Sequence, residues 1–297
     1  LSAQVTVGRK PTEENPNAGS LTVGAGVTVR LAEGGSVAVN SALRALGTAE
    51  DPVTFTGFDG GTVGFLDYSG ESVFRHAIFE HMLEGLVFYG MGETPSADTL
   101  TIEDCLFRDN VQSGMIFYGP GAGTISNSVF EDNGANGFTS SANAADEQRL
   151  VFEGCTFRNN IGTGVTADST YGLTFRNCLM HANGASGVYV DSWRIYQSVG
   201  AADPEKYVHR FINCTIAGNV GHGIESGESN AFSAWYISSS ILSGNAAGDV
   251  GAEASTVGGI VYSVVSSAED EPLLGWESIV ADPQFADPAN GDFHLKS

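Results

Sequence analysis

Two carboxylates end two matching segments of the chain and could do chemistry together. Asp168 ends TGVTAD and Asp191 ends SGVYVD, one repeat later. On adjacent strands such a pair would share a proton, or would hold a calcium ion together with Glu225. Arg194 and Lys206 follow in the longest insertion, where they would neutralise a substrate carboxylate or act as a base. We therefore predict Asp168, Asp191, Arg194 and Lys206 as catalytic residues, and Asp168, Asp191 and Glu225 as calcium ligands.

Aromatic and polar side chains surround these charges. The insertion carries Trp193 and Tyr196, and Tyr189 precedes it on an outward position, so that sugar rings could stack on flat aromatic faces. The predicted substrate-binding residues are Tyr118, Tyr189, Trp193, Tyr196, His222 and Glu225. A purely structural alternative stays open, in which the aspartates end strands and the aromatic residues pack the insertion onto the rest of the molecule.

A repeat supplies the elements that would position these residues. Six copies begin at Thr99, Gly123, Arg149, Gly172, His209 and Ala234. One column contains Cys105, Ser128, Cys155, Cys178, Cys214 and Ser240, and a second one, two residues later, contains Phe107, Phe130, Phe157, Met180, Ile216 and Leu242. Apolar positions spaced by two are typical of strands. The pattern therefore predicts short strands whose inner faces form one stacked core.

Corner residues complete each repeat. In each repeat an Asp, Asn, Gly or Ser lies between the first two short strands. These residue types favour turns and left-handed backbone angles. An unbroken asparagine column follows at Asn110, Asn133, Asn160, Asn183, Asn219 and Asn245. Such a column indicates amides that are hydrogen-bonded from coil to coil. A third short strand then follows a nearly constant glycine.

Three short strands per repeat predict an all-β fold, a single-stranded parallel β-helix of about nine coils stacked about 4.8 Å apart. We expect a lead-in over 1–20, the β-helix over 21–267 and a capping tail over 268–297. The cysteines would be buried and unpaired. We expect His181 at the surface. An outward apolar column runs through Leu106, Val129, Leu179 and Ile241, and either a loop or the tail covers it or it forms a surface for self-association or a partner.

Composition excludes some classes of protein. The chain has 35 acidic and 13 basic residues and a net charge of −22, which argues against a nucleic-acid partner because phosphate binding needs basic patches. No apolar run reaches the ~18 residues needed to cross a membrane. The chain opens at Leu1, and we expect that an upstream segment such as a signal peptide has been removed.

The repeat pattern, x-I-x-N-C-x-F-x-N-N followed by G-V, resembles that of the right-handed parallel β-helix, or pectate-lyase-like, superfamily of secreted bacterial proteins. The ending ADPQFADPANGDFHLKS resembles the tail of the same proteins. The resemblance implies a right-handed helix, export to the cell surface or beyond, and substrate on the outer face of the sheet built by the third strands. The first hypothesis is thus a secreted or cell-surface protein that binds a polysaccharide or cell-surface glycan there. The alternatives are a calcium-dependent lyase acting on uronate polymers and an adhesin-type structural spacer.

Overall fold

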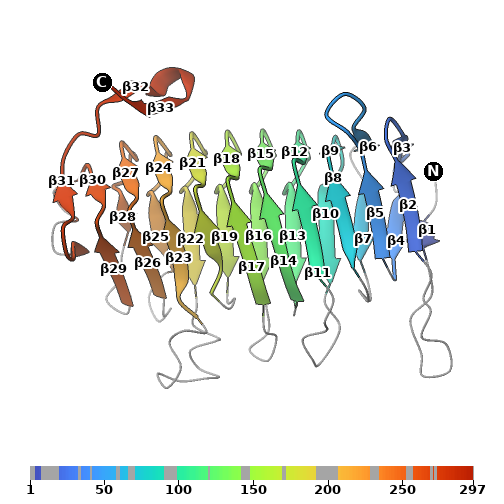
Figure 1. Cartoon of the computed structure of the whole chain (residues 1–297), viewed down its shortest axis with the longest axis horizontal. Helices are drawn as coiled ribbons and strands as arrows, with labels where there is room; N and C mark the ends of the chain where they lie inside the picture. The colour runs from blue at the N-terminus through green and yellow to red at the C-terminus, as the bar shows by residue number, and fades with distance from the viewer. Residues whose placement is uncertain are drawn as a thin grey trace.

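The computed structural model describes residues 4–7, 20–32, 35–40, 42–57, 61–65, 71–89, 99–119, 121–141, 148–168, 172–191, 207–227, 234–251, 257–267, 270 and 273–296. They form a parallel β-helix, in which the chain visits three parallel sheets in turn (Figure 1). Each sheet takes one strand per coil. The sheets have ten, ten and eleven strands, slightly more than the nine coils expected from the sequence.

The three sheets are named by the order in which the chain enters them. Sheet 1 contains β1 (Gln4–Val7), β4 (Ser36–Val39), β7 (Thr62–Phe65), β10 (Glu84–Tyr89), β13 (Met115–Tyr118), β16 (Phe138–Ser141), β19 (Val165–Asp168), β22 (Val188–Asp191), β25 (Ile224–Ser226) and β28 (Val250–Gly251). Sheet 2 contains β2 (Ser20–Gly24), β5 (Ala42–Leu46), β8 (Ser72–Arg75), β11 (Thr99–Glu103), β14 (Gly121–Ser126), β17 (Gln148–Glu153), β20 (Thr174–Arg176), β23 (His209–Ile212), β26 (Ala234–Ser238) and β29 (Val257–Val261). Sheet 3 contains β3 (Thr28–Arg30), β6 (Val53–Thr56), β9 (Ala77–Glu80), β12 (Leu106–Arg108), β15 (Val129–Glu131), β18 (Thr156–Arg158), β21 (Leu179–His181), β24 (Thr215–Ala217), β27 (Ile241–Ser243), β30 (Val264–Val265) and β31 (Ile279–Val280).

The ends of the β-helix differ from the expected boundaries. Strand β1 lies inside the predicted lead-in and already pairs with β4 in sheet 1. Strand β31 lies inside the predicted tail and pairs with β30 in sheet 3. Both strands continue the register of their sheets, with Val7 beside Val39 and Val280 beside Val265. The sequence next to them lacks the corner asparagine of the central repeats, which is why the repeat pattern did not find them.

Aromatic rings stack along the inside of sheet 3. The rings of Phe55, Phe79, Phe107, Phe130 and Phe157 follow one another with centroid separations of 4.9, 4.9, 4.6 and 4.7 Å. All five side chains are buried, and rings at this spacing gain contact energy beyond simple burial. The predicted inner column is confirmed. The four cysteines are also buried and unpaired, as predicted.

The asparagine column forms a ladder of buried amides. From Asn110 to Asn219, each side-chain Nδ2 donates to the Oδ1 of the asparagine one coil further on, at 2.8–3.0 Å. At the C-terminal end the Asn245 amide donates to the Asp249 carboxylate at 2.9 Å. Asp249 in turn accepts from the backbone N–H groups of Ser266 and Ser267. The predicted ladder is therefore confirmed, and an aspartate ends it.

The last described residues fold back over the side of the β-helix. Strands β32 (Phe285–Asp287) and β33 (Asp292–Leu295) pair as an antiparallel hairpin around the 3-10 turn η4 (Pro288–Asn290). This tail hairpin extends over β27, β24 and β21 at one edge of the molecule (Figure 1). It lies against Leu179, so the tail covers that part of the outward apolar column. Within the described residues, no helix has the length and apolar character that a membrane crossing requires.

Candidate functional site

Sheet 1 places three of the predicted site residues in one register column on its outer side, with Ser141 between them. Tyr118 at the end of β13 pairs with Ser141 of β16, which pairs with Asp168 of β19, which pairs with Asp191 of β22. Asp168 and Asp191 therefore lie on neighbouring strands, as predicted, and strands in a sheet are about 4.8 Å apart. Asp168 is exposed and Asp191 is half-buried. The two carboxylates thus lie at the C-terminal ends of two neighbouring strands of sheet 1.

Four predicted residues lie outside the described part of the chain. These are Trp193, Arg194, Tyr196 and Lys206, all in the insertion between β22 and β23. Their roles as aromatic faces, cation or base stay predictions.

A second group of polar side chains gathers one column away, on β22 and β25. Tyr189 is the register partner of Glu225, and both are half-buried on the outer face. The hydroxyl of Ser186, a fully buried residue, donates to Glu225 Oε2 at 2.5 Å. The backbone N–H of His222 donates to the same hydroxyl at 3.0 Å. Ser186 therefore fixes the Glu225 carboxylate, because its one proton is committed while its oxygen accepts from the next coil.

Ser186 is the functional residue that sequence reasoning missed. It stands directly before the glycine that precedes β22, where the two preceding coils carry Asn136 and Thr163. Its partner Glu225 is on the next coil but in a different column, so aligning columns does not bring the two together. A polar residue three positions before an outward strand position, with an acid at that outward position one coil later, would have been the signal.

Hydroxyls and one amide continue this polar strip toward the N-terminus. Asn136 Oδ1 accepts from the Thr163 backbone N–H at 2.9 Å and from the Thr163 hydroxyl at 3.0 Å. Thr163 and Thr166 also share a short hydroxyl contact of 2.5 Å, and Asn136 Nδ2 donates to Thr139 at 3.1 Å. The outer face of sheet 1 thus presents hydrogen-bonding groups on consecutive coils, one strand spacing apart.

A buried histidine lies at the start of β23, in sheet 2. His209 is fully buried, and its Nδ1 accepts from the Leu173 backbone N–H at 3.2 Å. Desolvation, together with the nearby Arg210 charge, lowers the pKa of His209 to about 3. The imidazole is therefore neutral, and because it is fully buried it does not act as an acid–base group at the surface.

The described residues do not assemble a metal centre. Among them, no three His, Cys, Asp or Glu side chains converge closely enough to hold an ion. Asp168 and Asp191 share one column, whereas Glu225 lies in another and is bonded to Ser186. Calcium takes six to eight oxygen ligands, so Asp168, Asp191 and Glu225 do not by themselves fit a calcium site.

Comparisons with known proteins agree with this architecture. A family model described as "Right handed beta helix region" matches residues 89–261, more than half of the chain. A double mutant of a periplasmic alginate epimerase superposes with a TM-score of 0.53 at 11% identity, covering 94% of this chain and 77% of that one. A pectate lyase gives a TM-score of 0.50 at 15% identity, covering 95% and 70%. A mannuronan C-5 epimerase module from Azotobacter vinelandii gives 0.43 at 17% identity, covering 88% and 77%. No curated protein sequence matches the chain. Likenesses at these identities show the fold alone.

Proposed function

The chain belongs to the right-handed β-helix family, and we propose that it is a secreted or cell-surface protein that binds polysaccharide along the outer face of sheet 1. Two proteins of the same fold are named for action on pectate and alginate, which supports a glycan ligand. A flat face whose groups repeat at the strand spacing suits an extended polymer, because successive sugar units can meet successive coils.

The observation that carries the proposal is the group formed by Tyr189, Glu225 and Ser186. Tyr189 offers an aromatic face beside a carboxylate that Ser186 holds in one orientation. Sugar recognition needs this combination, an apolar face for the ring and a fixed acceptor for its hydroxyls. Because Ser186 already orders Glu225, less conformational entropy is lost when ligand binds.

The charge of this face predicts which polysaccharides bind best. Asp168, Asp191 and Glu225 are all acidic and lie on neighbouring coils. Carboxylates accept hydrogen bonds from neutral hydroxyls and repel uronate carboxylates. Neutral polymers should therefore bind more tightly than uronate polymers, unless Arg194 and Lys206 add their positive charges to the site.

A calcium-dependent lyase acting on uronate polymers is the alternative. The in-register pair of Asp168 and Asp191 favours it, since two carboxylates could contribute ligands to an ion. The described residues supply no third ligand to the pair. We therefore derive no catalytic step through calcium.

A glycan array combined with a product assay tests the three functions. Binding predicts retention on at least one polysaccharide, reduced about ten-fold or more by Tyr189→Ala and by Glu225→Gln. The matched control is Tyr236→Ala, a partly exposed tyrosine on the outside of sheet 2, which should leave retention unchanged. Ultraviolet-absorbing unsaturated uronates that disappear on calcium chelation would establish the lyase instead. If the protein neither binds nor cleaves any of the polymers, the adhesin-type structural spacer is the function that remains.

A further inference from the structure

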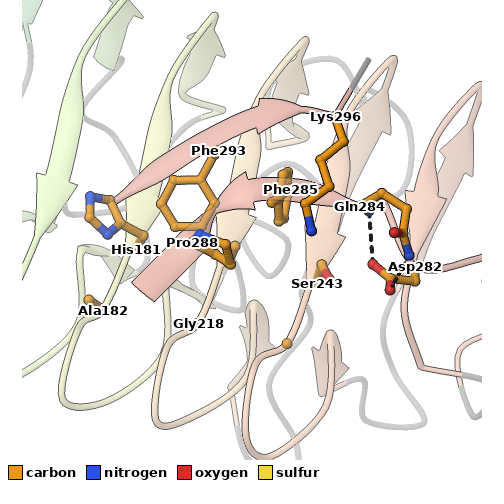
Figure 2. Close-up of a pocket in the computed structure, with 12 residues that line it drawn as sticks. His181, Ala182, Gly218, Ser243, Asp282, Gln284, Phe285, Pro288, Phe293 and Lys296 are labelled. Atoms are coloured by element: carbon orange, nitrogen blue, oxygen red, sulfur yellow. Dashed lines mark hydrogen bonds between the residues drawn. The ribbon is translucent and has the colours of Figure 1, made fainter. Parts of the chain in front are cut away.

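A cavity of about 420 Å³ lies between the tail hairpin and the side of the β-helix, away from sheet 1 (Figure 2). Its floor is formed by the ends of β21, β24 and β27, and its roof by β32, η4 and β33. This volume is near the low end of the ~300–1,000 Å³ typical of small-molecule pockets. It is large enough for a single ring with its substituents.

Short side chains on three consecutive coils create this space. The last strand residue of sheet 3 is long and charged on earlier coils, at Glu80, Arg108, Glu131 and Arg158, and becomes His181, Ala217 and Ser243 below the hairpin. The next position, in left-handed conformation, changes in the same way from Asp109, Asp132 and Asn159 to Ala182, Gly218 and Gly244. The hairpin therefore docks where the coils have lost their long side chains. It leaves part of the resulting volume empty.

One wall of the cavity is apolar. Phe293 meets His181 edge-on with ring centroids 5.0 Å apart, and it meets Phe285 edge-on at 5.1 Å. Pro288 completes this wall beside Phe293 (Figure 2). His181 is buried, contrary to the surface position expected from the sequence, because the tail covers it. Burial, and secondarily the charge of Arg158, lower its pKa, so the imidazole contributes a neutral surface.

The opposite side of the cavity carries one uncommitted positive charge. The Lys296 side chain extends toward Ser243 (Figure 2), and within the described residues its ammonium has no ion-pair partner. Asp282 also borders the cavity, but its carboxylate accepts from the Gln284 backbone N–H at 2.8 Å and from Gln284 Nε2 at 2.5 Å. Ser243 lines the same cavity and lies below the Lys296 side chain in the view of Figure 2. An anionic group placed here would meet a cation and a hydroxyl donor.

We propose that this cavity is a second ligand site, which binds a small molecule consisting of a six-membered ring that carries a carboxylate. The ring lies against Phe293 and Pro288, and the carboxylate is bonded to Lys296 and Ser243. A hexuronate and an aromatic acid share this chemistry. The site lies on a different sheet from the polysaccharide face and does not depend on that proposed function.

Titration of the whole chain with two acids and their neutral counterparts tests the proposal. The probes are methyl α-D-galacturonide against methyl α-D-galactoside, and benzoate against benzamide. Isothermal calorimetry measures affinity, and the NMR signals of the His181 ring locate the ligand. We expect at least one acid to bind and to shift the His181 signals, and its neutral counterpart to bind at least ten-fold more weakly. Which acid binds decides between the two sources.

Variants of the two residues that would contact the carboxylate, Lys296 and Ser243, complete the test. Lys296→Gln should lower the affinity about ten-fold and Lys296→Arg should retain it, since Lys296 is exposed and its side chain has no partner in the described fold. Ser243→Leu should abolish binding by filling the cavity, and Tyr236→Ala should have no effect. A thermal unfolding curve checks that each variant is folded. The proposal is overturned if neither acid shifts the His181 signals, if the neutral counterparts bind equally well, or if Lys296→Gln binds like the unmodified chain.

Discussion

Replacing one rung of the asparagine ladder should strongly destabilise the fold. In Asn160→Ala four side-chain hydrogen bonds disappear. Asn160 Oδ1 accepts from the backbone and side-chain nitrogens of Asn133 at 3.2 and 2.9 Å, and Asn160 Nδ2 donates to Phe130 O at 3.1 Å and to Asn183 Oδ1 at 3.0 Å. All these groups are buried, so water does not replace the lost partners.

The magnitude follows from the number of bonds and their burial. A hydrogen bond contributes about 1 kcal/mol net, and a buried group left without a partner adds about 1–3 kcal/mol. The expected loss for Asn160→Ala is on the order of 4–6 kcal/mol. This is a large share of the ~5–15 kcal/mol by which domains are stable. The variant should therefore unfold at a much lower urea concentration.

Urea-induced unfolding is the assay, and Asn177→Gly is the matched control. Asn177 is exposed at a left-handed corner with φ of 54°, where the equivalent residue on the preceding coil is already Gly154. Its replacement removes one exposed hydrogen bond, with Asn213, and should change stability by less than about 1 kcal/mol. Because solenoids can unfold in segments, amide exchange of the flanking coils is recorded as well. A loss below about 1.5 kcal/mol for Asn160→Ala, or one no larger than the control, would refute the reasoning.

Three further perturbations have defined outcomes. Phe157→Ala should lower the free energy of unfolding by about 3–5 kcal/mol, because removal of a ring from the stacked core leaves a cavity. A loss below about 1.5 kcal/mol in urea-induced unfolding would argue against close packing around this ring. His209→Gln should flatten the acid dependence of stability. The pKa of His209 is lowered to about 3 in the folded protein, so the native side chain stays neutral, whereas the same histidine in the unfolded chain binds a proton below about pH 6.5. The neutral histidine therefore costs the fold no stability above about pH 6.5. As the pH falls toward 3, the free energy of unfolding decreases by up to ~1.4 kcal/mol per pH unit. Parallel acid profiles of the two proteins in thermal unfolding would contradict this. Glu131→Gln should change the melting temperature little, since the side chain of its partner Arg158 is 44% exposed and ion pairs open to solvent contribute about 0–1 kcal/mol. A loss above about 2 kcal/mol would show that the charged residues at the ends of the sheet 3 strands stabilise as a network.

The repeat made most of the fold predictable. Columns such as Phe107 with Phe130 recur at fixed offsets, and a strand period of two admits only one way to place them inside. The hydrogen-bonded ladder was equally predictable from the asparagine column, because buried amides need hydrogen-bond partners and the neighbouring coils offer the same residue. The ends were not predictable, because the sequence next to β1 and β31 lacks the corner asparagine that marks the central repeats. The burial of His181 also escaped, because it depends on Phe293, which is more than a hundred residues away.

The candidate site was predictable in its register and not in its contacts. Asp168 and Asp191 were placed on neighbouring strands by alignment alone, and the structure confirms this. The hydrogen bond between Ser186 and Glu225 joins two adjacent coils at different aligned positions. An alignment of the repeats therefore does not reveal it. The sequence also predicted that Asp168, Asp191 and Glu225 together bind calcium. Alignment gives the strand on which each carboxylate lies, but it does not give the distances between the carboxylates.

The uniform direction of the asparagine bonds gives the β-helix an electrical polarity. Every amide from Asn110 to Asn245 donates one N–H to an acceptor on its C-terminal side, and its oxygen accepts from the N-terminal side. Aligned dipoles add, as they do along an α-helix, and each bond polarises the next. The positive end of this row meets the carboxylate of Asp249, and the negative end accepts the Met82 backbone N–H. Asp249 thus acts as a counter-charge for a field that six coils build together.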